Sequence, residues 1–476
     1  MTDAPTFVVF GATGHLSRTK LIPALARVLA AEHITDHALI GVGSRSRSDD
    51  SFRSMVEDSL REAGTPPNVT TSFVAAPIRY LAVSDDASYD TLARVVAETE
   101  DAAGLPQNRV LYLAIPPSQL DATVMGVQSS GLDNGDGWTR LVVEKPFGTN
   151  LATAKRSNEI IHRSFHENQV YRIDHFLGKE TVRNLLVFRF TNSLFEQTWN
   201  RRHIESVEIT VAETAGLDGR AGYFDESGTV RDMVQNHLTQ ILTLIAMEPP
   251  VTMDAPSIHT EKVKVLSAMR QIEPDHAVIG QYTPGVVAGH PVGGYLEEPG
   301  VPQRSTTPTF AALRVHIDNW RWHGVPFFLR TGKRMSKRSS IITVRYLRPP
   351  ICLFHAEGTC SGHQNVLRMR LQPDEGFDLL FDVKQPGDET RIEQIALTVN
   401  YDAVRAGAAD AYETLLTDVI EGDQTLFVRA DEVEAAWERY EPLLDRGDIH
   451  PYAAGTDGPE GADRLMLPDE GMWARL

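Results

Sequence analysis

Residues 172–180, RIDHFLGKE, place an acid, a histidine and a lysine close together. These are Asp174, His175 and Lys179. His175 and Lys179 are four positions apart, so on a helical turn they share a face. Two such donors suit a phosphate dianion, because each charge-assisted hydrogen bond contributes about 1.5–3 kcal/mol. The alternative is an ordinary surface pair with no ligand.

A second histidine, His237, projects into the middle of an apolar helical stripe formed by Val230, Val234, Leu238, Ile241 and Ile245. Burial lowers the proton affinity of a histidine and keeps it neutral at pH 7. A general base must be neutral before it accepts a proton. The pattern therefore allows a catalytic base, although a core histidine with satisfied hydrogen bonds would show the same pattern.

The residues that could bind a dinucleotide come early in the chain. Residues 6–10 form an apolar run that ends in the turn FGATGHLSRTK. Gly11 and Gly14 would let this turn approach a pyrophosphate at the start of the next helix. A plain strand-to-helix turn is the alternative, since the spacing is not the usual G-x-G-x-x-G.

The next apolar run, residues 38–42, is followed by GSRSRS, with no acid before Asp49. NAD-binding proteins usually carry an acid here, which binds the ribose hydroxyls. Arg45 and Arg47 instead stand where a 2′-phosphate would lie, and arginine binds phosphate in a bidentate way. Given a dinucleotide site, we expect NADP rather than NAD; two solvated arginines are the alternative.

The pattern of the strands and helices that would position these residues differs between the first and second parts of the chain. The first part alternates apolar runs with amphipathic helical patterns, including residues 110–115 and 141–143, which is typical of a doubly wound parallel sheet. After a boundary near 174–200, polar and apolar residues alternate, which favours one large antiparallel sheet. Helical patterns interrupt it near 227–247 and 410–440, and residues 280–308, rich in Gly and Pro, should be irregular.

Length and charge limit the function classes. The chain has 476 residues and a formal net charge of −18, so it is a poor binder of nucleic acid or anionic membranes. Two cysteines, Cys352 and Cys360, cannot make a disulfide framework or a structural zinc site unaided. There is no signal-peptide pattern and no apolar run of roughly 18 residues, so we expect a soluble cytoplasmic protein.

Several motifs together resemble the glucose-6-phosphate dehydrogenase family. They run in the family's order over nearly the whole chain: GATGHLSRTKL, VVEKPFG at 142–148, RIDHFLGKE, RDMVQNHL at 231–238, VPFFLRTGKR at 325–334, and the helical region 412–437. The resemblance implies a Rossmann-type coenzyme domain at 1–174, followed by a β+α substrate and dimerisation domain at 175–476 with a large antiparallel sheet. It also implies NADP as coenzyme and a homodimer or homotetramer.

The resemblance assigns roles to individual residues. It makes His237 the base and Asp174 the partner that orients it. It places His175 and Lys179 on the sugar phosphate, and Lys145 on both the sugar and the coenzyme. Further substrate contacts would come from Glu213, Asp232 and Lys333, and no metal is implied.

Three features of the sequence complicate these assignments. On a regular helix Asp232 lies about 140° around the axis from His237, so both can serve one ligand only if the helix is irregular there. His15 stands where the family usually has an acid after the second glycine, and Phe176 where it often has tyrosine. A further family lysine is replaced by Arg338, with Lys337 beside it.

The expected activity is oxidation of β-D-glucose 6-phosphate at C1 to the 6-phosphogluconolactone, the first step of the oxidative pentose phosphate pathway. One alternative is another oxidoreductase with the EKP motif that acts on a different, non-phosphorylated sugar. A coenzyme sensor without catalysis should lack Asp174 or His237, and both are present. A short-chain dehydrogenase needs a Tyr-x-x-x-Lys pair, which the chain does not contain.

Overall fold

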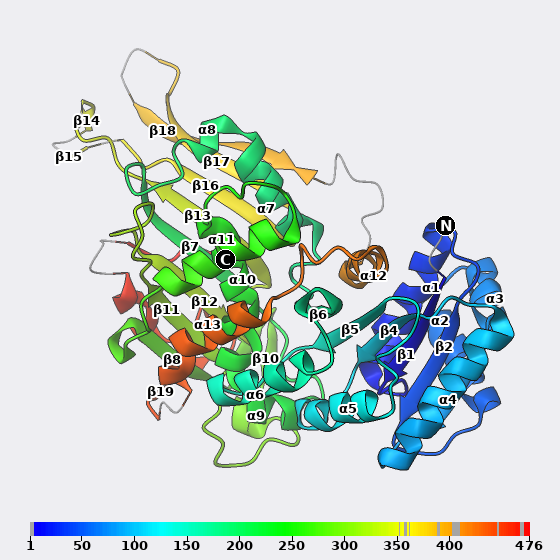
Figure 1. Ribbon diagram of the computed structural model, residues 1–476. Helices are drawn as coiled ribbons and strands as arrows, with labels where there is room; N and C mark the ends of the chain where they lie inside the picture. Colours follow the sequence, from blue (N-terminus) through cyan, green and yellow to red (C-terminus); the bar gives the residue numbers. More distant parts are fainter. Residues whose placement is uncertain are drawn as a thin grey trace. The chain divides into compact units, whose positions relative to one another are not determined.

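The computed structural model describes residues 4–351, 353–356, 359–360, 362–387, 391–401, 410–444, 447–466 and 471–476. The chain folds into two compact units (Figure 1). The first comprises Met1–Lys179, Thr252–His259 and Ala409–Glu434, and the second comprises Glu180–Val251, Thr260–Ala408 and Ala435–Leu476. Cys352 lies outside the described residues.

The first unit is built on a six-stranded sheet in the order β3-β2-β1-β4-β5-β6, in which all neighbouring strands are parallel. The strands are β1 (Pro5–Phe10), β2 (Ala38–Gly43), β3 (Ile78–Ala82), β4 (Asn108–Leu113), β5 (Thr139–Glu144) and β6 (Val170–Ile173). β1 and β4 are buried along their whole length, as expected for central strands covered on both faces. The predicted parallel sheet is confirmed.

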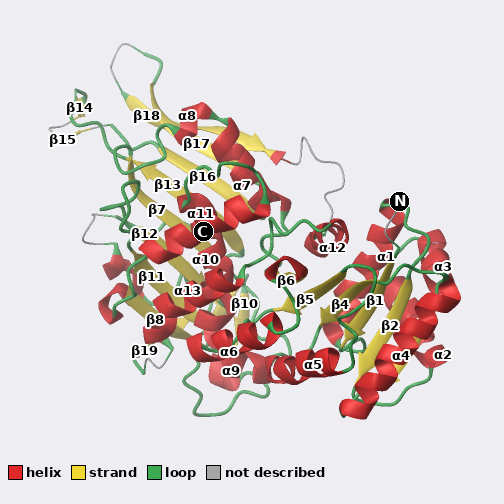
Figure 2. Ribbon diagram, viewed as in Figure 1, coloured by secondary structure: helices red, strands yellow, loops and turns green. Residues whose placement is uncertain are grey.

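Helices fall into two packed groups in this unit (Figure 2). In one group, α1 (Ile22–Ala31) packs against α2 (Asp49–Glu62), α3 (Pro67–Ala75) and α12 (Ala411–Glu421). In the other, α5 (Pro117–Ser129) packs against α4 (Asp86–Ala103) and α6 (Leu151–His162). Such helices let a parallel sheet bury its apolar residues on both sides.

Helix α12 belongs to the first unit although it comes from the end of the chain. Arg140 of β5 donates to the carbonyl oxygens of Val419 and Ile420 over 2.6 Å each. A cation that binds the last carbonyls of a helix also complements its dipole. Gln424, just beyond the helix, donates to the carbonyls of Glu167 and Val170, both at 2.9 Å. Helix α12 and the residues directly after it are therefore an integral part of the first unit.

The second unit contains a nine-stranded sheet in the order β18-β17-β16-β13-β7-β12-β11-β8-β19. The strands are β7 (Ile204–Ala212), β8 (Ala277–Thr283), β11 (Phe310–Val315), β12 (Phe327–Gly332), β13 (Ser339–Tyr346), β16 (Val366–Gln372), β17 (Gly376–Lys384), β18 (Ile392–Asn400) and β19 (Ile449–Ala453). All of its pairings are antiparallel except β7 with β12 and β8 with β19. The large antiparallel sheet is confirmed, with two parallel pairings that alternation of residue types could not reveal.

Residues 280–308 are more ordered than expected. β8 continues to Thr283, and the hairpin of β9 (Gly285–Val287) and β10 (His290–Val292) follows. The Gly and Pro residues here shape a hairpin rather than exclude strands. A second short pair, β14 (His355–Ala356) with β15 (Thr359–Cys360), lies farther along the chain.

The helices of the second unit are α7 (Glu180–Thr191), α8 (Ser193–Glu196), α9 (Ala221–Thr229), the π-helix η3 (Val230–Leu238) and α10 (Thr239–Ala246). Helices α11 (Ala255–Ala268) and α13 (Ala430–Tyr440) contribute residues to both units. Short 3-10 turns (η2 Glu167–Gln169, η4 Pro274–His276, η5 Tyr295–Glu297, η7 Glu441–Leu443 and η8 Glu460–Leu465) join the larger elements. Among the described helices, none combines the length and apolar character that crossing a membrane requires.

Candidate active site

The turn predicted to bind a dinucleotide follows β1 and requires glycine at its first position. Gly11 has φ +77°, and a Cβ added there would lie 2.2 Å from the carbonyl oxygen of Ala114. The amide of Gly14 donates to the carbonyl of Gly11 over 2.9 Å and closes the turn. A helical stretch begins directly after it, with the π-turn η1 (Ser17–Leu21) followed by α1. This close backbone approach is the kind of cradle a pyrophosphate needs.

Arg45 and Arg47 lie after β2 and are exposed, together with the serines between and beside them. Arg47 makes only long hydrogen bonds, of 3.4 and 3.5 Å, to Ser51. The guanidinium of Arg45 makes no hydrogen bond or ion pair with any residue that the structure describes. Asp49, the first acid after these arginines, is paired with Arg79 at 2.7 Å. The end of β2 thus presents cations to solvent, as a 2′-phosphate site requires.

Lys145 directly follows β5, at the carboxyl edge of the parallel sheet where such folds place ligands. The peptide bond between Lys145 and Pro146 is cis. Just before it, Glu144 Oε1 accepts hydrogen bonds from Tyr112 Oη at 2.6 Å and from Tyr412 Oη at 3.3 Å. Neither Glu144 nor the two tyrosines is among the residues predicted for the site. The sequence signal for Glu144 was its place directly before Lys145 in the EKP motif.

Asp174 follows β6 and is fully buried. Its Oδ1 accepts a hydrogen bond of 2.9 Å from the amide of Phe176, and its carbonyl accepts one from Leu177. The segment from His175 to Lys179 forms turns with bonds between residues three apart, and α7 begins only at Glu180. His175 and Lys179 therefore lie in successive tight turns rather than in a regular α-helix.

The ring of Phe176 contacts the side chains of both His175 and Lys179. The ammonium nitrogen of Lys179 lies 3.4 Å from the centroid of the Phe176 ring, and the His175 ring meets the same ring edge-on at 5.2 Å. A cation over an aromatic face is attracted by the ring's quadrupole. The phenyl ring thus supports both members of the predicted phosphate clamp, although it lacks the hydroxyl that a tyrosine would offer.

Helix α12 packs directly on this loop. A Cβ added at Gly178 would lie 2.7 Å from the carbonyl oxygen of Ala411 and 2.8 Å from Leu415 Cγ. Only glycine allows so close an approach. Because Tyr412 of the same helix binds Glu144, α12 links the RIDHFLGKE loop to the end of β5. The helical region 412–437 therefore contacts both the RIDHFLGKE loop and the end of β5, which its helical pattern alone could not predict.

In the second unit, His237 is fully buried on η3, and its amide donates to Asn236 Oδ1 over 2.6 Å. Asp232 is partly exposed on the same element. Hydrogen bonds in a π-helix run between residues five apart, so such residues stack on one another. Asp232 and His237 are five apart, and the π-helix removes the conflict that a regular helix created. The irregular helix that sequence reasoning called for is present.

Glu213 and Lys333 come together in the same unit. Glu213 follows β7 and Lys333 follows β12, and these adjacent strands are parallel. The Lys333 ammonium lies 2.8 Å from Glu213 Oε2. η3 packs against both strands. Two residues 120 positions apart thus form one polar pair at the carboxyl end of a parallel strand pair, and the antiparallel reading of the sequence could not place them side by side.

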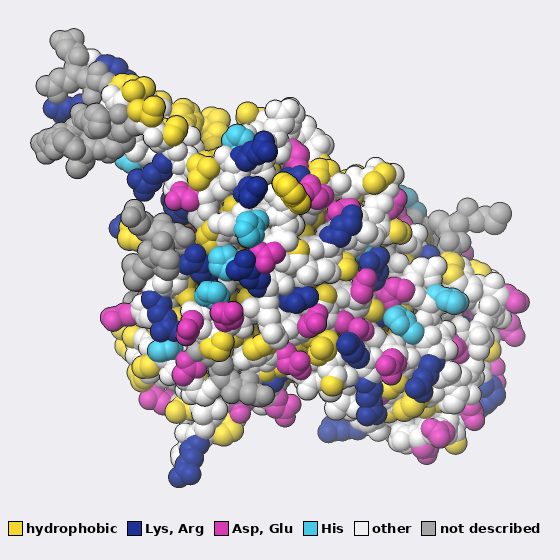
Figure 3. All heavy atoms as spheres, turned by 60° about the vertical axis from the view of Figure 1, so that its left-hand side comes forward, with side chains coloured by type: hydrophobic (Ala, Val, Ile, Leu, Met, Phe, Trp, Pro, Cys, Tyr) yellow, Lys and Arg dark blue, Asp and Glu magenta, His cyan; other side chains and the backbone are white. Residues whose placement is uncertain are grey.

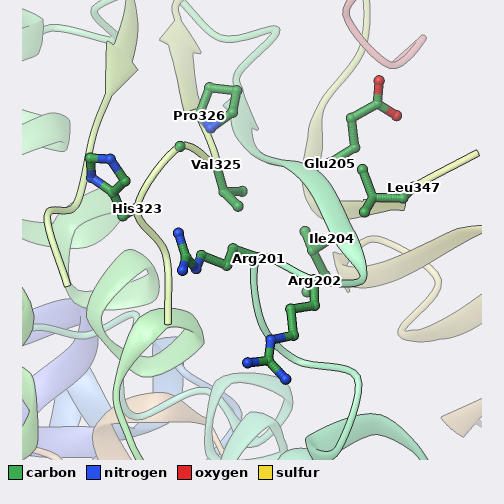
Figure 4. Close-up of a pocket in the computed structure, with 9 residues that line it drawn as sticks. Arg201, Arg202, Ile204, Glu205, His323, Val325, Pro326 and Leu347 are labelled. Atoms are coloured by element: carbon green, nitrogen blue, oxygen red, sulfur yellow. The ribbon is translucent and has the colours of Figure 1, made fainter. Parts of the chain in front are cut away.

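A pocket of about 450 Å³ in the second unit lies elsewhere (Figure 4). Its lining includes Ile204 at the start of β7, and Val325 and Pro326 just before β12, together with Arg201 and His323. It is therefore at the amino ends of the two strands whose carboxyl ends carry Glu213 and Lys333. A strand of nine residues spans roughly 30 Å. The pocket is not the site of the predicted sugar contacts.

The predicted residues are divided between the two units. Gly11, Gly14, Arg45, Lys145, Asp174, His175 and Lys179 belong to the first unit, whereas Glu213, Asp232, His237 and Lys333 belong to the second. The pairing of Asp174 with His237 joins residues of different units and stays a prediction.

Comparisons with known proteins cover nearly the whole chain. The family model "Glucose-6-phosphate dehydrogenase, NAD binding domain" matches residues 8–184, and the model of the C-terminal domain matches residues 186–474. The glucose-6-phosphate 1-dehydrogenase of Aggregatibacter actinomycetemcomitans is 42% identical over 98% of this chain and 97% of its own length. That of Mycolicibacterium smegmatis is 41% identical, over 99% and 97%.

Two solved structures agree. One, a glucose-6-phosphate dehydrogenase in complex with its substrate glucose-6-phosphate, has a TM-score of 0.89 and 32% identity. The glucose-6-phosphate 1-dehydrogenase of Mycobacterium avium has a TM-score of 0.85 and 33% identity. Each likeness covers 99% of this chain and 99% of the other chain. The chain therefore belongs to the glucose-6-phosphate dehydrogenase family.

Proposed function

We propose that the protein oxidises β-D-glucose 6-phosphate at C1 to 6-phospho-D-glucono-1,5-lactone, with NADP as hydride acceptor. The observation that carries this proposal is full-length similarity to relatives named for this reaction, at 42% identity over 98% of the chain. The turn motifs, the phosphate clamp and the polar pair described above supply chemistry of the kind that the reaction needs.

Residues of the first unit are suited to hold NADP. The cradle at Gly11 and Gly14 would receive the pyrophosphate, and exposed Arg45 and Arg47 would bind the 2′-phosphate. When bound, the coenzyme's nicotinamide supplies the hydride acceptor. Lys145, at the end of β5, would lie near both the coenzyme and the sugar.

The substrate's phosphate would be held by His175 and Lys179, supported by the Phe176 ring. Glu213, Asp232 and Lys333 would bind the sugar hydroxyls. Since the Lys333–Glu213 pair already neutralises both charges, each partner is held in a fixed orientation before substrate arrives. Binding then requires little reorganisation of these side chains.

His237 would take the proton from the C1 hydroxyl. A neutral histidine can accept it, and Asp174 would hold the ring in the correct tautomer and stabilise the imidazolium that forms. This step requires the buried carboxylate of the first unit to meet the buried imidazole of the second. Proton removal by a positioned base contributes about 10²–10⁴-fold to the rate.

The functional division at residue 174/175, self-association and location belong to the same proposal. Homo-oligomer formation through the large sheet is supported by β18, which is an edge strand of the described sheet with Ile395 and Leu397 exposed. An exposed edge with apolar side chains is a surface that proteins tend to cover.

The proposed substrates are charged and do not cross membranes unaided, which favours a cytoplasmic location.

The charge on the surface indicates whether nucleic acid or a membrane is a partner. Acidic and basic side chains are interspersed over the face seen in Figure 3, and the chain's net charge is −18. Nucleic-acid binding relies on clustered cations that replace counterions. The proposal therefore includes no nucleic-acid or membrane partner.

Steady-state reduction of NADP and of NAD with glucose 6-phosphate tests the proposal. Glucose and 6-phosphogluconate serve as control substrates. We expect rapid NADPH formation with glucose 6-phosphate and little with either control. Equal kcat/KM for glucose and glucose 6-phosphate would overturn the assigned substrate and favour an oxidoreductase of a different sugar.

A further inference from the structure

A chain of hydrogen bonds within the second unit ends on the backbone of Lys333. The hydroxyl of Tyr452, in β19, donates to the carbonyl oxygen of Lys333 over 2.6 Å. Thr309 directly precedes β11, and its Oγ1 lies 3.1 Å from the same hydroxyl. The backbone amide of Tyr282, in β8, donates to Thr309 Oγ1 over 3.0 Å. Residues from four parts of the sheet therefore meet at the turn that follows β12.

The acceptor at its end determines the direction of this chain. A carbonyl oxygen can only accept, so the single phenol proton of Tyr452 points at Lys333; the Thr309 carbonyl oxygen is farther away, at 3.4 Å. Thr309 Oγ1 then donates to the Tyr452 oxygen and accepts from the amide of Tyr282. Hydrogen bonds arranged head to tail polarise and strengthen one another. Burial also raises the pKa of the Tyr452 hydroxyl well above its usual value, so the phenol remains a donor.

The turn that carries Lys333 is strained and is held from several sides. Arg334 has φ +51°, in the left-handed region that residues with a side chain rarely adopt. Its amide donates to the carbonyl of Ala215 over 3.1 Å, and its carbonyl accepts from the amide of Gly455 over 2.7 Å. The amide of Lys333 donates to the carbonyl of Thr309 over 2.9 Å. Such a conformation persists only where surrounding bonds determine it, and it is most frequent at functional sites.

The position of the Lys333 backbone determines where its ammonium group lies. The ammonium nitrogen is 2.8 Å from Glu213 Oε2 and 5.0 Å from the centroid of the Phe224 ring. The backbone of Glu213 is bonded to the same turn: its amide donates to Gly332 over 3.0 Å, and its carbonyl accepts from the amide of Met335 over 2.8 Å. A displaced Lys333 backbone would therefore change the position of the ammonium group relative to the Glu213 carboxylate.

We propose that Tyr452 is a positioning residue for substrate binding: its hydroxyl, oriented by Thr309, fixes the backbone of Lys333 so that the ammonium group and the Glu213 carboxylate stay side by side, where both can bind hydroxyl groups of one sugar ring. The inference rests on the proposed function, which assigns Lys333 and Glu213 to the substrate. It gives a part in substrate binding to β19, which lies three strands from β12 at the edge of the described sheet.

The main test is Tyr452→Phe, which removes the hydroxyl and keeps the ring that packs on Phe310 with centroids 5.5 Å apart. The Lys333 carbonyl then loses its donor, and the turn can relax. We expect Kd and KM for glucose 6-phosphate to rise about 3- to 10-fold, because part of the sugar's hydrogen bonding is lost. kcat should change much less. Calorimetric titration without coenzyme and steady-state kinetics measure these constants, and unchanged values in a folded protein would overturn the inference.

Thr309 provides a second way to interrupt the chain. Thr309→Val removes the hydroxyl that orients Tyr452, and should raise Kd and KM by a factor similar to that of Tyr452→Phe. Thr309→Ser keeps the hydroxyl and should bind the sugar phosphate as the wild type does. Thr309 is fully buried, so the melting temperature of each variant is measured as well. Equal losses of affinity in the valine and serine variants would show that the hydroxyl does not matter, which contradicts the inference.

Thr283 provides the matched control, because its hydroxyl donates to the carbonyl oxygen of the same Tyr452 over 3.1 Å. Thr283→Val weakens the attachment of β19 but leaves the Tyr452 hydroxyl in place. It should lower the melting temperature slightly and leave Kd and KM unchanged. A rise in Kd as large as that in Tyr452→Phe would mean that general loosening of β19 explains both results, and the inference would fail.

Lys333→Met distinguishes failure of the inference from failure of the proposed function. If Lys333 binds the sugar, this variant loses affinity, and adding Tyr452→Phe causes little further loss, because Tyr452 acts through Lys333. Fully additive losses would overturn the inference and leave the proposed function intact. Wild-type Kd and turnover in Lys333→Met would overturn the assignment of Lys333 to the substrate, and the inference with it, although the protein would still oxidise glucose 6-phosphate.

Discussion

The two sheets of this protein carry their polar residues in different ways. In the six-stranded sheet every pairing is parallel, so all carboxyl ends share one edge, and the coenzyme turn, the arginines, Lys145 and Asp174 each follow a strand. In the nine-stranded sheet the strands mostly alternate in direction, and neighbouring strand ends point to opposite edges. A mostly antiparallel sheet needs a special device to bring residues of two strands together.

That device is the parallel pairing of β7 with β12. It brings Glu213 and Lys333 to the same edge, whereas each strand's other neighbour is antiparallel. η3 packs against these two strands and carries Asp232 and His237 with π-helical spacing. The predicted site residues of the second unit are thus brought together by departures from regular structure, whereas those of the first unit follow from the regular topology.

The largest expected effect tests the role proposed for His237, on η3 of the second unit. His237→Asn should lower kcat by about 10²–10⁴-fold, because the proposed general base is lost. KM for glucose 6-phosphate should change little, since the proposal assigns the phosphate to His175 and Lys179. Steady-state kinetics at saturating NADP measure both constants. Wild-type kcat in a folded His237→Asn protein would refute the role of His237 and leave η3 as a structural feature.

A smaller effect is expected from the proposed phosphate clamp of the first unit, formed by His175 and Lys179. Lys179→Ala removes a charged donor worth about 1.5–3 kcal/mol, so KM for glucose 6-phosphate should rise roughly 10- to 100-fold. kcat should fall much less than in His237→Asn. Phe176→Leu removes the ring below the Lys179 ammonium, and should raise KM by a smaller factor. A change in kcat alone would contradict the clamp.

A further effect concerns coenzyme choice. Arg45→Ala with Arg47→Ala should raise KM for NADP about 10-fold or more, because charge-assisted bonds to the 2′-phosphate are lost. KM for NAD should be nearly unchanged, since NAD has no such phosphate. Kinetics with both coenzymes at a fixed sugar-phosphate concentration compare them. Equal increases for the two coenzymes would show that the arginines do not read the 2′-phosphate.

The two units also differ in how much of their structure could be predicted from the sequence. Buried apolar runs that end in Gly or Pro placed β1, β2, β4 and β5 correctly, because parallel strands must be apolar on both faces. The pairing of β7 with β12 could not be predicted, because alternation shows that one face is solvated but not which strand lies beside which. The return of α12 to the first unit was equally hidden, since it depends on contacts between residues hundreds of positions apart, such as Tyr412 with Glu144.

The smallest expected effect uses a second buried histidine. His37 is 4% exposed just before β2, at the opposite end of that strand from the arginines, and its ring packs 5.1 Å from that of Phe73. Burial lowers the pKa of His37 below its usual value of 6.5, while the nearby backbone of Thr35 and Phe73 and the charge of Asp36 raise it by less. Unlike His237, this histidine faces no predicted ligand, and we expect a role in stability alone.

The lowered pKa of His37 determines how stability depends on pH. The unfolded chain binds a proton to His37 below about pH 6.5, but the folded protein does so only at lower pH, so stability is lost as the pH falls through this range. One group contributes a slope of at most about 1.4 kcal/mol per pH unit. His37→Leu should therefore flatten the dependence of the unfolding free energy on pH below 6.5 and leave kcat/KM unchanged. Urea unfolding at pH 7.5 and 5.5 measures the slope. A large fall in kcat/KM in a folded His37→Leu protein would contradict the purely structural role expected for His37.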